Sequence, residues 1–326
     1  MKKTLLALIA FVGIFSSCNN DDITISRSFT FKVNPTTVVD NLFEAKAGDL
    51  TSLTGDNKLI VSLYIYNEKG ELVSKTSDKY SAYTQMMTKD IDLPSGQNYT
   101  AVATTHVTSN VNFWVFSGEE QLSTFKIKDN GYIGGKSKIL GLSVVKFTAG
   151  NQNETININV ENAGAVAWVW FKSWNNSNYT SLNINEYALM SKKSCDYISF
   201  DNSGNKDYSL ESENTYNFFM AKFEYDSSYS GASAYFFTFP IKNASFRFYA
   251  IKNNEYYYMG EELVDDIILG HSYAFMYDFD EDKATAGDVT PESSRSNPQS
   301  NILEKFKILR NEHINYNYEE GSISIR

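Results

Sequence analysis

Short segments with alternating apolar and polar residues follow one another along most of the chain. Leu59, Val61, Leu63 and Ile65 share one parity, and the Asn-Glu-Lys-Gly of residues 67–70 supplies the turn of a hairpin. Residues 155–160 alternate cleanly as well. Residues 165–171 are apolar on both parities, which predicts a central strand covered on both faces. The pattern therefore predicts an all-β protein.

Two turn segments of this pattern resemble each other. Residues 93–99 and 267–273 each combine apolar residues, a Gly, two polar residues and a Tyr that opens the next strand. The repeat predicts a duplicated fold, and short strands with frequent turns bury their cores best as two packed sheets. We expect two tandem β-sandwich domains, at residues 26–148 and 149–283, with the boundary in the polar stretch 148–153.

The last part of the chain, residues 284–326, is expected to be a linker followed by a C-terminal extension. Ser, Pro, Thr and Asn dominate as far as residue 301, and apolar residues at helical spacing in 302–309 then predict one short amphipathic helix. The end alternates again and is a candidate segment for strand addition to a partner, with pairing inside its own sheet as the alternative. Its apolar positions are Ile314, Tyr316, Tyr318, Ile323 and Ile325.

The N-terminal residues read as the start of an exported lipoprotein. A basic start and an apolar run over residues 5–15, too short to span a bilayer, precede Ser-Ser-Cys18. We expect residues 1–17 to be a signal peptide that is removed, and residues 18–25 to be a lipidated N-terminus and linker. Acyl chains such as palmitate on Cys18 would anchor the protein in the cell outer membrane, because several chains bind a bilayer more firmly than one. Ordinary secretion with cleavage nearby is the alternative.

The charge limits which partners are expected, and the cysteine content limits which disulfides can form. The acidic Asn-Asn-Asp-Asp of residues 19–22 indicates display on the cell surface, with a plain solvated linker as the alternative. The formal net charge is −10, and loss of the two leader lysines makes it more negative, so nucleic acid is not expected as a partner. Once Cys18 is acylated, Cys195 is the only cysteine left, so we expect no intramolecular disulfide and a buried Cys195.

No catalytic or metal-binding pattern is found. The chain has no HExxH, no Gly-x-Ser-x-Gly and no phosphate-binding Gly loop, and its three histidines are scattered: His106, His271 and His313. Asp278, Asp280 and Asp282 match the opening of a calcium loop, but the twelfth position is Val289, so a solvated strand face explains them better. We therefore expect no enzyme activity, no metal and no cofactor.

Three tryptophans form the candidate ligand-binding cluster: Trp168, Trp170 and Trp174. The first two share a parity, and aromatic rings in a row can form a platform for a sugar. The competing interpretation is that they belong to the core, because Val169 and Phe171 on the other parity indicate burial on both faces. We favour the core.

The order of these features resembles the fimbrillin superfamily of Bacteroidales, in the plan of its lipid-anchored accessory members, the fimbrillin-A-associated anchor proteins. The resemblance rests on the lipoprotein start, residues 63–70, the turn at 93–99, and Thr238-Phe239-Pro240 before Phe246-Arg247-Phe248. It covers roughly residues 26 to 280. It implies two Greek-key, transthyretin-like β-sandwiches at the cell surface that anchor or assemble fimbriae, or act in adhesion.

The resemblance also bears on the first strand and on the partners. Stalk members of the superfamily are cleaved after a basic residue of this strand, where the chain has Arg27, but we expect an anchor to stay uncut and keep its tether. We therefore expect a surface lipoprotein whose partners are fimbrial subunits, or host or bacterial surface proteins. The alternative is a glycan-binding lipoprotein of a polysaccharide-uptake system.

Overall fold

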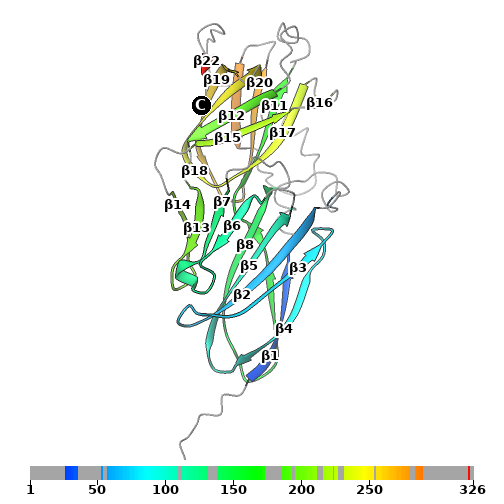
Figure 1. Cartoon of the computed structure of the whole chain (residues 1–326), viewed down its shortest axis with the longest axis vertical. Coiled ribbons are helices and arrows are strands. Elements are labelled where there is room, and N and C mark those ends of the chain that lie inside the picture. The colour runs from blue at the N-terminus through cyan, green and yellow to red at the C-terminus, as the bar shows by residue number, and fades with distance from the viewer. Residues whose placement is uncertain are drawn as a thin grey trace, which may run out of the picture.

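The structure is a computed structural model that confirms the all-β prediction (Figure 1). It describes residues 26–35, 53, 57–108, 112–130, 138–172, 186–192, 195–210, 216–222, 224–226, 231–252, 255–278, 283–288 and 322–323. Within these residues the only helical element is the 3-10 turn η1 (Leu122–Thr124), and none is a helix long and apolar enough to cross a membrane. Cys18 and the predicted helix at 302–309 lie outside the described residues.

Three sheets build the first half of the molecule, with strand orders β4-β1-β9, β10-β8-β5-β2-β3 and β14-β13-β7-β6. The strands are β1 (Ser26–Asn34), β2 (Lys58–Asn67), β3 (Leu72–Tyr80), β4 (Met87–Pro94), β5 (Asn98–Thr108), β6 (Trp114–Ser117), β7 (Lys126–Asp129), β8 (Leu140–Thr148), β9 (Glu154–Asn159), β10 (Glu161–Asn162), β13 (Tyr197–Phe200) and β14 (Lys206–Ser209).

The five-stranded sheet is covered on both faces by the other two. On one face, Phe147 of β8 packs against Phe31 of β1, with ring centroids 5.5 Å apart. On the opposite face, Tyr64 of β2 packs against Phe125, which precedes β7, at 4.9 Å. Six consecutive residues of β2, from Val61 to Tyr66, are buried, because this strand is apolar on both parities. The predicted hairpin is present, since β2 pairs antiparallel with β3.

The second half is a sandwich of two five-stranded sheets, ordered β16-β17-β11-β20-β21 and β15-β12-β18-β19-β22. Phe246 of β18 and Phe275 of β20 meet between the sheets, with ring centroids 4.2 Å apart. The strands are β11 (Ala165–Lys172), β12 (Glu186–Lys192), β15 (Tyr216–Lys222), β16 (Glu224–Asp226), β17 (Gly231–Thr238), β18 (Ile241–Lys252), β19 (Glu255–Ile267), β20 (Ser272–Asp278), β21 (Lys283–Asp288) and β22 (Ser322–Ile323).

The strand pairing shifts the domain boundary relative to the predicted one. β9 pairs parallel with β1, and β10 pairs antiparallel with β8, so the sheets of the first half continue to Asn162 rather than stopping at residue 148. The hairpin β13–β14 follows the start of the second half in sequence, yet β13 pairs with β7 of the first half. The polar stretch 148–153 is therefore a turn inside the first half.

The repeated turn is present in both halves. Gly96 and Gly270 have φ values of +78° and +76°, a conformation that glycine adopts without strain. Each glycine N–H donates to a carbonyl of a neighbouring segment, at Ala149 (2.7 Å) and Gly164 (2.8 Å) respectively. The tyrosine that follows donates its hydroxyl back to the preceding strand, from Tyr99 to Pro94 O (3.3 Å) and from Tyr273 to Asp266 O (3.0 Å).

Candidate functional site

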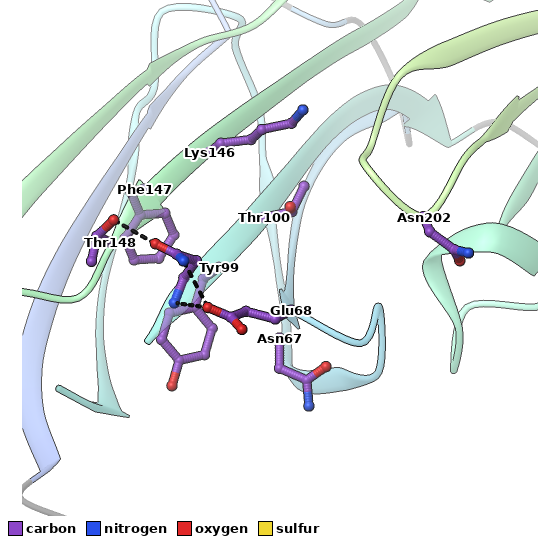
Figure 2. Close-up of a pocket in the computed structure, with 9 residues that line it drawn as sticks. Asn67, Glu68, Tyr99, Thr100, Lys146, Phe147, Thr148 and Asn202 are labelled. Carbon is purple, nitrogen blue, oxygen red and sulfur yellow. Dashed lines mark hydrogen bonds between the residues drawn. The ribbon is translucent and has the colours of Figure 1, made fainter. Parts of the chain in front are cut away.

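An open pocket of about 330 Å³ lies where four segments of the first half meet (Figure 2). Two of them are the β2–β3 turn and the β13–β14 turn, and the other two are the start of β5 and the end of β8. The lining residues are Asn67, Glu68, Asn98, Tyr99, Thr100, Lys146, Phe147, Thr148 and Asn202. The hairpin β13–β14 thus contributes one wall of a pocket that is otherwise built by strands far from it in sequence.

The polar groups on one side of this pocket form hydrogen bonds with one another. The Glu68 carboxylate accepts hydrogen bonds from the backbone N–H (3.2 Å) and the side-chain amide (2.6 Å) of Asn98. The Thr148 hydroxyl donates to the side-chain oxygen Oδ1 of Asn98 at 2.6 Å (Figure 2). Tyr99 stacks on Phe147 with centroids 5.6 Å apart and is only 3% exposed, so its ring offers no open face to a ligand.

The opposite side of the pocket carries a single exposed cation. The Lys146 ammonium points away from Glu68 (Figure 2), and within the described residues it has no hydrogen bond or ion pair. The nearby Asp201 carboxyl is engaged by Asn205, whose N–H donates to it at 2.8 Å; this contact, with a smaller contribution from Lys146, lowers the pKa of Asp201. The pocket presents hydrogen-bonding groups but no nucleophile with an adjacent base.

The hairpin β13–β14 docks on the five-stranded sheet through Gly204. This residue has φ +75°, and a Cβ placed on it would lie 2.9 Å from Thr100 Cγ2 and 3.2 Å from Val144 Cγ1. Phe200 of the same hairpin stacks on Phe125 with centroids 5.3 Å apart. Because residue 204 has no side chain, the backbone of the hairpin can approach the five-stranded sheet closely and cover this part of its face.

A cluster of aromatic rings joins the hairpin and the two halves. The ring centroid of Trp114 in β6 lies 5.5 Å from that of Phe237 and 5.2 Å from that of Phe239, and both phenylalanines belong to the second half. Tyr208 of β14 packs against Phe239 at 6.1 Å and donates its hydroxyl to Ala163 O at 3.3 Å. Burial raises the pKa of Tyr208, so its hydroxyl stays protonated and keeps donating. We call Trp114, Tyr208, Phe237 and Phe239 the junction.

A buried ion pair lies beside the junction. Lys138 Nζ donates to Asp129 Oδ2 at 2.8 Å, and the two side chains are only 7% and 9% exposed. The same ammonium lies 5.8 Å from the centroid of the Trp114 ring, within the range of a cation–π contact. Because a buried charge is stable only when paired, this ion pair ties the segment before β8 to the end of β7.

The backbone places Trp168 and Trp170 in β11, the central strand of its sheet. By register, Trp168 lies opposite Tyr235 of β17 and Ala274 of β20. The predicted central strand is thus present, paired on both sides. Trp174 lies outside the described residues, so the cluster of three tryptophans stays a prediction.

Most of the candidate strand-addition segment also lies outside the described residues, namely Ile314, Tyr316, Tyr318 and Ile325. Ile323 is in β22, which pairs antiparallel with β19, with Ile323 opposite Tyr256. This contact is the intramolecular pairing that the sequence left open. Cys195 is buried (2% exposed), as expected, and its thiol donates to Tyr197 O at 3.2 Å. Within the described residues no group of three or more His, Cys, Asp or Glu could hold a metal ion.

Sequence reasoning missed the hairpin β13–β14, which completes the pocket, and the contact of Trp114 with the second half. The hairpin signal was available, because Tyr197–Phe200 alternates and the Asp-Asn-Ser-Gly-Asn of residues 201–205 is rich in turn formers. Its partner strand was not available, because alternation does not encode which strand pairs with which. Trp114 stands apart from the three clustered tryptophans and carries no local signal for its contact with the second half.

Comparison with known proteins gives similarities in structure alone. No family model matches the chain, and no curated protein matches it. Among solved structures, the chain is similar to the fimbrial anchor protein Mfa2 from Porphyromonas gingivalis, with 11% identity and a TM-score of 0.42 over 82% of this chain and 98% of that one.

Two solved structures from Bacteroides thetaiotaomicron are similar to a comparable degree. One is a candidate adhesin, with 12% identity and a TM-score of 0.49 over 77% of this chain and 91% of that one. The other is a candidate polysaccharide-binding protein, with 14% identity and a TM-score of 0.46 over 78% of this chain and 92% of that one.

Proposed function

We propose that this chain is a cell-surface lipoprotein, held at the outer membrane through Cys18, that anchors or assembles fimbriae or acts in adhesion. It works through protein–protein contacts and not through catalysis. Its partners are fimbrial subunits, or host or bacterial surface proteins. The proposal rests on the lipoprotein start of the sequence and on the resemblance of its strand and turn segments to the fimbrillin anchors.

One observation on the fold supports this role most directly. Figure 1 shows β1, the first described strand after Cys18, starting at one end of an elongated molecule, with the sheets of the second half at the other end. A lipid at Cys18 would therefore hold the β1 end of the molecule near the membrane, and the second half would point away from the membrane. The junction and the hairpin β13–β14 connect the two halves along this axis.

The chemistry of the described residues agrees with a binding protein. The pocket holds a carboxylate, amides, hydroxyls and one ammonium without a nucleophile–base pair, and the Lys138–Asp129 ion pair is almost entirely buried. We therefore include the absence of catalysis in the proposal. A broad hydrolase screen of the purified chain should be negative, and turnover of any substrate that is lost on mutating a pocket residue would contradict it.

The experiment for the anchoring role replaces Cys18 by Ser in the chromosomal gene. Fimbriae should then be shed, so that the fimbrial antigen in the medium rises several-fold relative to the antigen on cells. Ser17→Ala is the matched control, because it keeps a small residue before the cysteine and should leave retention unchanged. Equal retention of fimbriae and equal adhesion in the Cys18→Ser strain would overturn the proposal.

The alternative function is capture of a glycan, and the open polar pocket is the observation that favours it (Figure 2). The anchoring role is preferred because Tyr99 and Phe147 stack on each other instead of offering a ring face to a sugar. Affinity electrophoresis against a panel of polysaccharides separates the two roles. Retardation that is lost with Lys146→Ala or Asn202→Ala would favour the glycan site, and no retardation would favour anchoring.

A further inference from the structure

The first strand lies between two neighbours that run in opposite directions. β1 pairs antiparallel with β4 over eight positions, from Ser26 opposite Pro94 to Val33 opposite Met87. It pairs parallel with β9 over six positions, from Phe29 opposite Glu154 to Asn34 opposite Asn159. Every N–H and C=O of a strand in this position can find a partner on one side or the other. We call β1 with these two ladders the β1 clamp.

The start of β1 and the end of its parallel neighbour β9 point toward opposite ends of the molecule. In Figure 1, β1 begins at the lower end of the molecule, and the chain from Cys18 enters this strand at its first residue, Ser26. β9 runs in the same direction and ends at Asn159, from which the chain continues through β10 to β11 of the second half. A pull between Cys18 and the second half therefore draws β1 down and β9 up, along their common axis.

Load in this direction is shared by all the bonds of a ladder at once. Two strands that are pulled along their length from opposite ends must slide past each other, so their hydrogen bonds break together. Two strands pulled apart from the same end separate one bond at a time, and a single hydrogen bond contributes little net free energy. The first arrangement resists a much larger force because the same total bond energy is lost over a much shorter extension.

The side chains of β1 add to this resistance. Phe29, Phe31 and Val33 are fully buried between the three-stranded and five-stranded sheets, and Phe31 packs edge-on against Phe147. Sliding by one residue would turn these apolar side chains toward solvent. At the far end the ladder is closed by Val160, whose N–H donates to Asn34 O at 2.9 Å.

We infer that the β1 clamp is a force-bearing element, which lets the chain hold a load between the lipid at Cys18 and the second half without unfolding. This inference rests on the proposed anchoring function, because only a tethered chain is loaded along this axis. The load enters at Ser26 and is transferred to β4 and β9.

Single-molecule pulling of the mature chain tests this directly. The chain is expressed from Cys18 onward without the leader, so that its thiol serves as the first handle. Cys195 is only 2% exposed and does not compete for the label. The second handle is Glu161→Cys, an exposed residue of β10 two positions after the end of β9, or Asp92→Cys, an exposed residue near the end of β4 that lies beside the start of β1.

The two handles load the same strand in different ways. Cys18 with Glu161→Cys loads the ladders along their axis, whereas Cys18 with Asp92→Cys peels β1 away from β4. We expect the first rupture force to be at least about twofold higher in the axial geometry at the same pulling speed, because the bonds are then loaded together. An axial force equal to or below the peeling force would overturn the inference.

A pair of proline variants provides the second test. Val160→Pro removes the N–H that bonds to Asn34, and Asn157→Pro is its matched control, because residues of that parity direct their N–H to the free edge of β9. We expect Val160→Pro to lower the axial force and Asn157→Pro to leave it unchanged. Equal effects of the two proline variants on the axial force would contradict the clamp. If Val160→Pro does not fold, the comparison of the axial and peeling forces in the otherwise native sequence tests the clamp instead.

The outcomes separate the clamp from the anchoring role. Pulling experiments use the purified chain and do not depend on fimbriae or membranes. A high axial force together with normal fimbrial retention in the Cys18→Ser strain would overturn the function and keep the mechanical assignment. A low axial force with shed fimbriae in that strain would keep the function and overturn the clamp.

Discussion

The indole of Trp114 packs edge-on against the phenyl ring of Phe237, with centroids 5.5 Å apart and ring planes at 87°. The first residue belongs to β6 of the first half and the second to β17 of the second half. Aromatic pairs in this geometry contribute about 0.5–1.5 kcal/mol beyond the area that they bury. The contact makes the two halves depend on each other for stability, which leads to the first prediction.

Trp114→Ala should destabilise the chain and uncouple its halves. Removing a buried Trp costs about 3–5 kcal/mol. We expect a single thermal transition to split into two, measured by scanning calorimetry. Val115→Ala is the control, because Val115 is 40% exposed and its truncation should cost less than about 0.5 kcal/mol. One unsplit transition in Trp114→Ala would show that the junction does not couple the halves.

Gly204→Ala should loosen the hairpin β13–β14 from the five-stranded sheet. The residue has φ +75°, and its new Cβ would meet Thr100 Cγ2 at 2.9 Å. We expect a loss of about 2–4 kcal/mol, of which about 1–2 is backbone strain and the rest close packing. Gly96→Ala isolates the backbone strain, because its φ is +78° and no atom lies within 4 Å of its Cβ position.

Urea unfolding of the two glycine variants measures the difference. Gly204→Ala should lose clearly more free energy of unfolding than Gly96→Ala, and its hairpin amides should exchange hydrogen faster. Equal losses would mean that the packing of the hairpin on the sheet contributes little.

Lys138→Met should be strongly destabilising, because it leaves the Asp129 carboxylate buried without its cation. Breaking a buried pair costs about 3–5 kcal/mol, whereas replacing both partners by apolar residues is often neutral. We therefore expect Lys138→Met with Asp129→Leu to recover most of the loss. Lys75→Met, which breaks the exposed pair with Glu119, should cost no more than about 1 kcal/mol. A double variant no more stable than Lys138→Met would contradict this account.

His106 should make the first half sensitive to acid. Its imidazole is half-buried on β5 beside Phe116, at a centroid distance of 4.9 Å, and its buried Nδ1 atom has no hydrogen-bond partner in the described part of the chain. Burial lowers the pKa of His106 from 6.5 to about 4. The unfolded chain binds the proton first, so stability falls as the pH drops from about 6.5 to about 4, by about 3 kcal/mol in total.

Urea unfolding between pH 7 and pH 4 measures this dependence. His106→Leu should remove the acid-dependent loss that the histidine causes, and His271→Gln should retain it, since His106 is still present. An unchanged slope in His106→Leu would show that other groups govern acid stability.

The sequence predicts the local structure of this protein well and its long-range pairing poorly. The strand at residues 59–65, its hairpin, the central strand at 165–171 and the two repeated turns all follow from alternation and turn chemistry, and the structure contains them. These features depend on neighbours in sequence. The partner of a strand depends instead on which edges remain free after other strands have paired.

Two examples show this limit. The segment 154–159 alternates as predicted, but its parallel pairing with β1, about 125 residues away, is visible only in the structure. The hairpin 197–209 has no feature that distinguishes β7 of the first half from the strands of its own half, so the predicted boundary at 148 and 149 fell too early. The pocket and the junction depend on that pairing and were out of reach for the same reason.

Attachment of lipid to Cys18 is the claim on which the anchoring function depends. The direct measurement is growth with labelled palmitate, followed by separation of outer membranes, for the native chain and for Cys18→Ser. The account predicts label on the native chain and its retention in the membrane fraction after a high-salt wash, with both lost in Cys18→Ser. Full membrane retention of an unlabelled Cys18→Ser chain would contradict it.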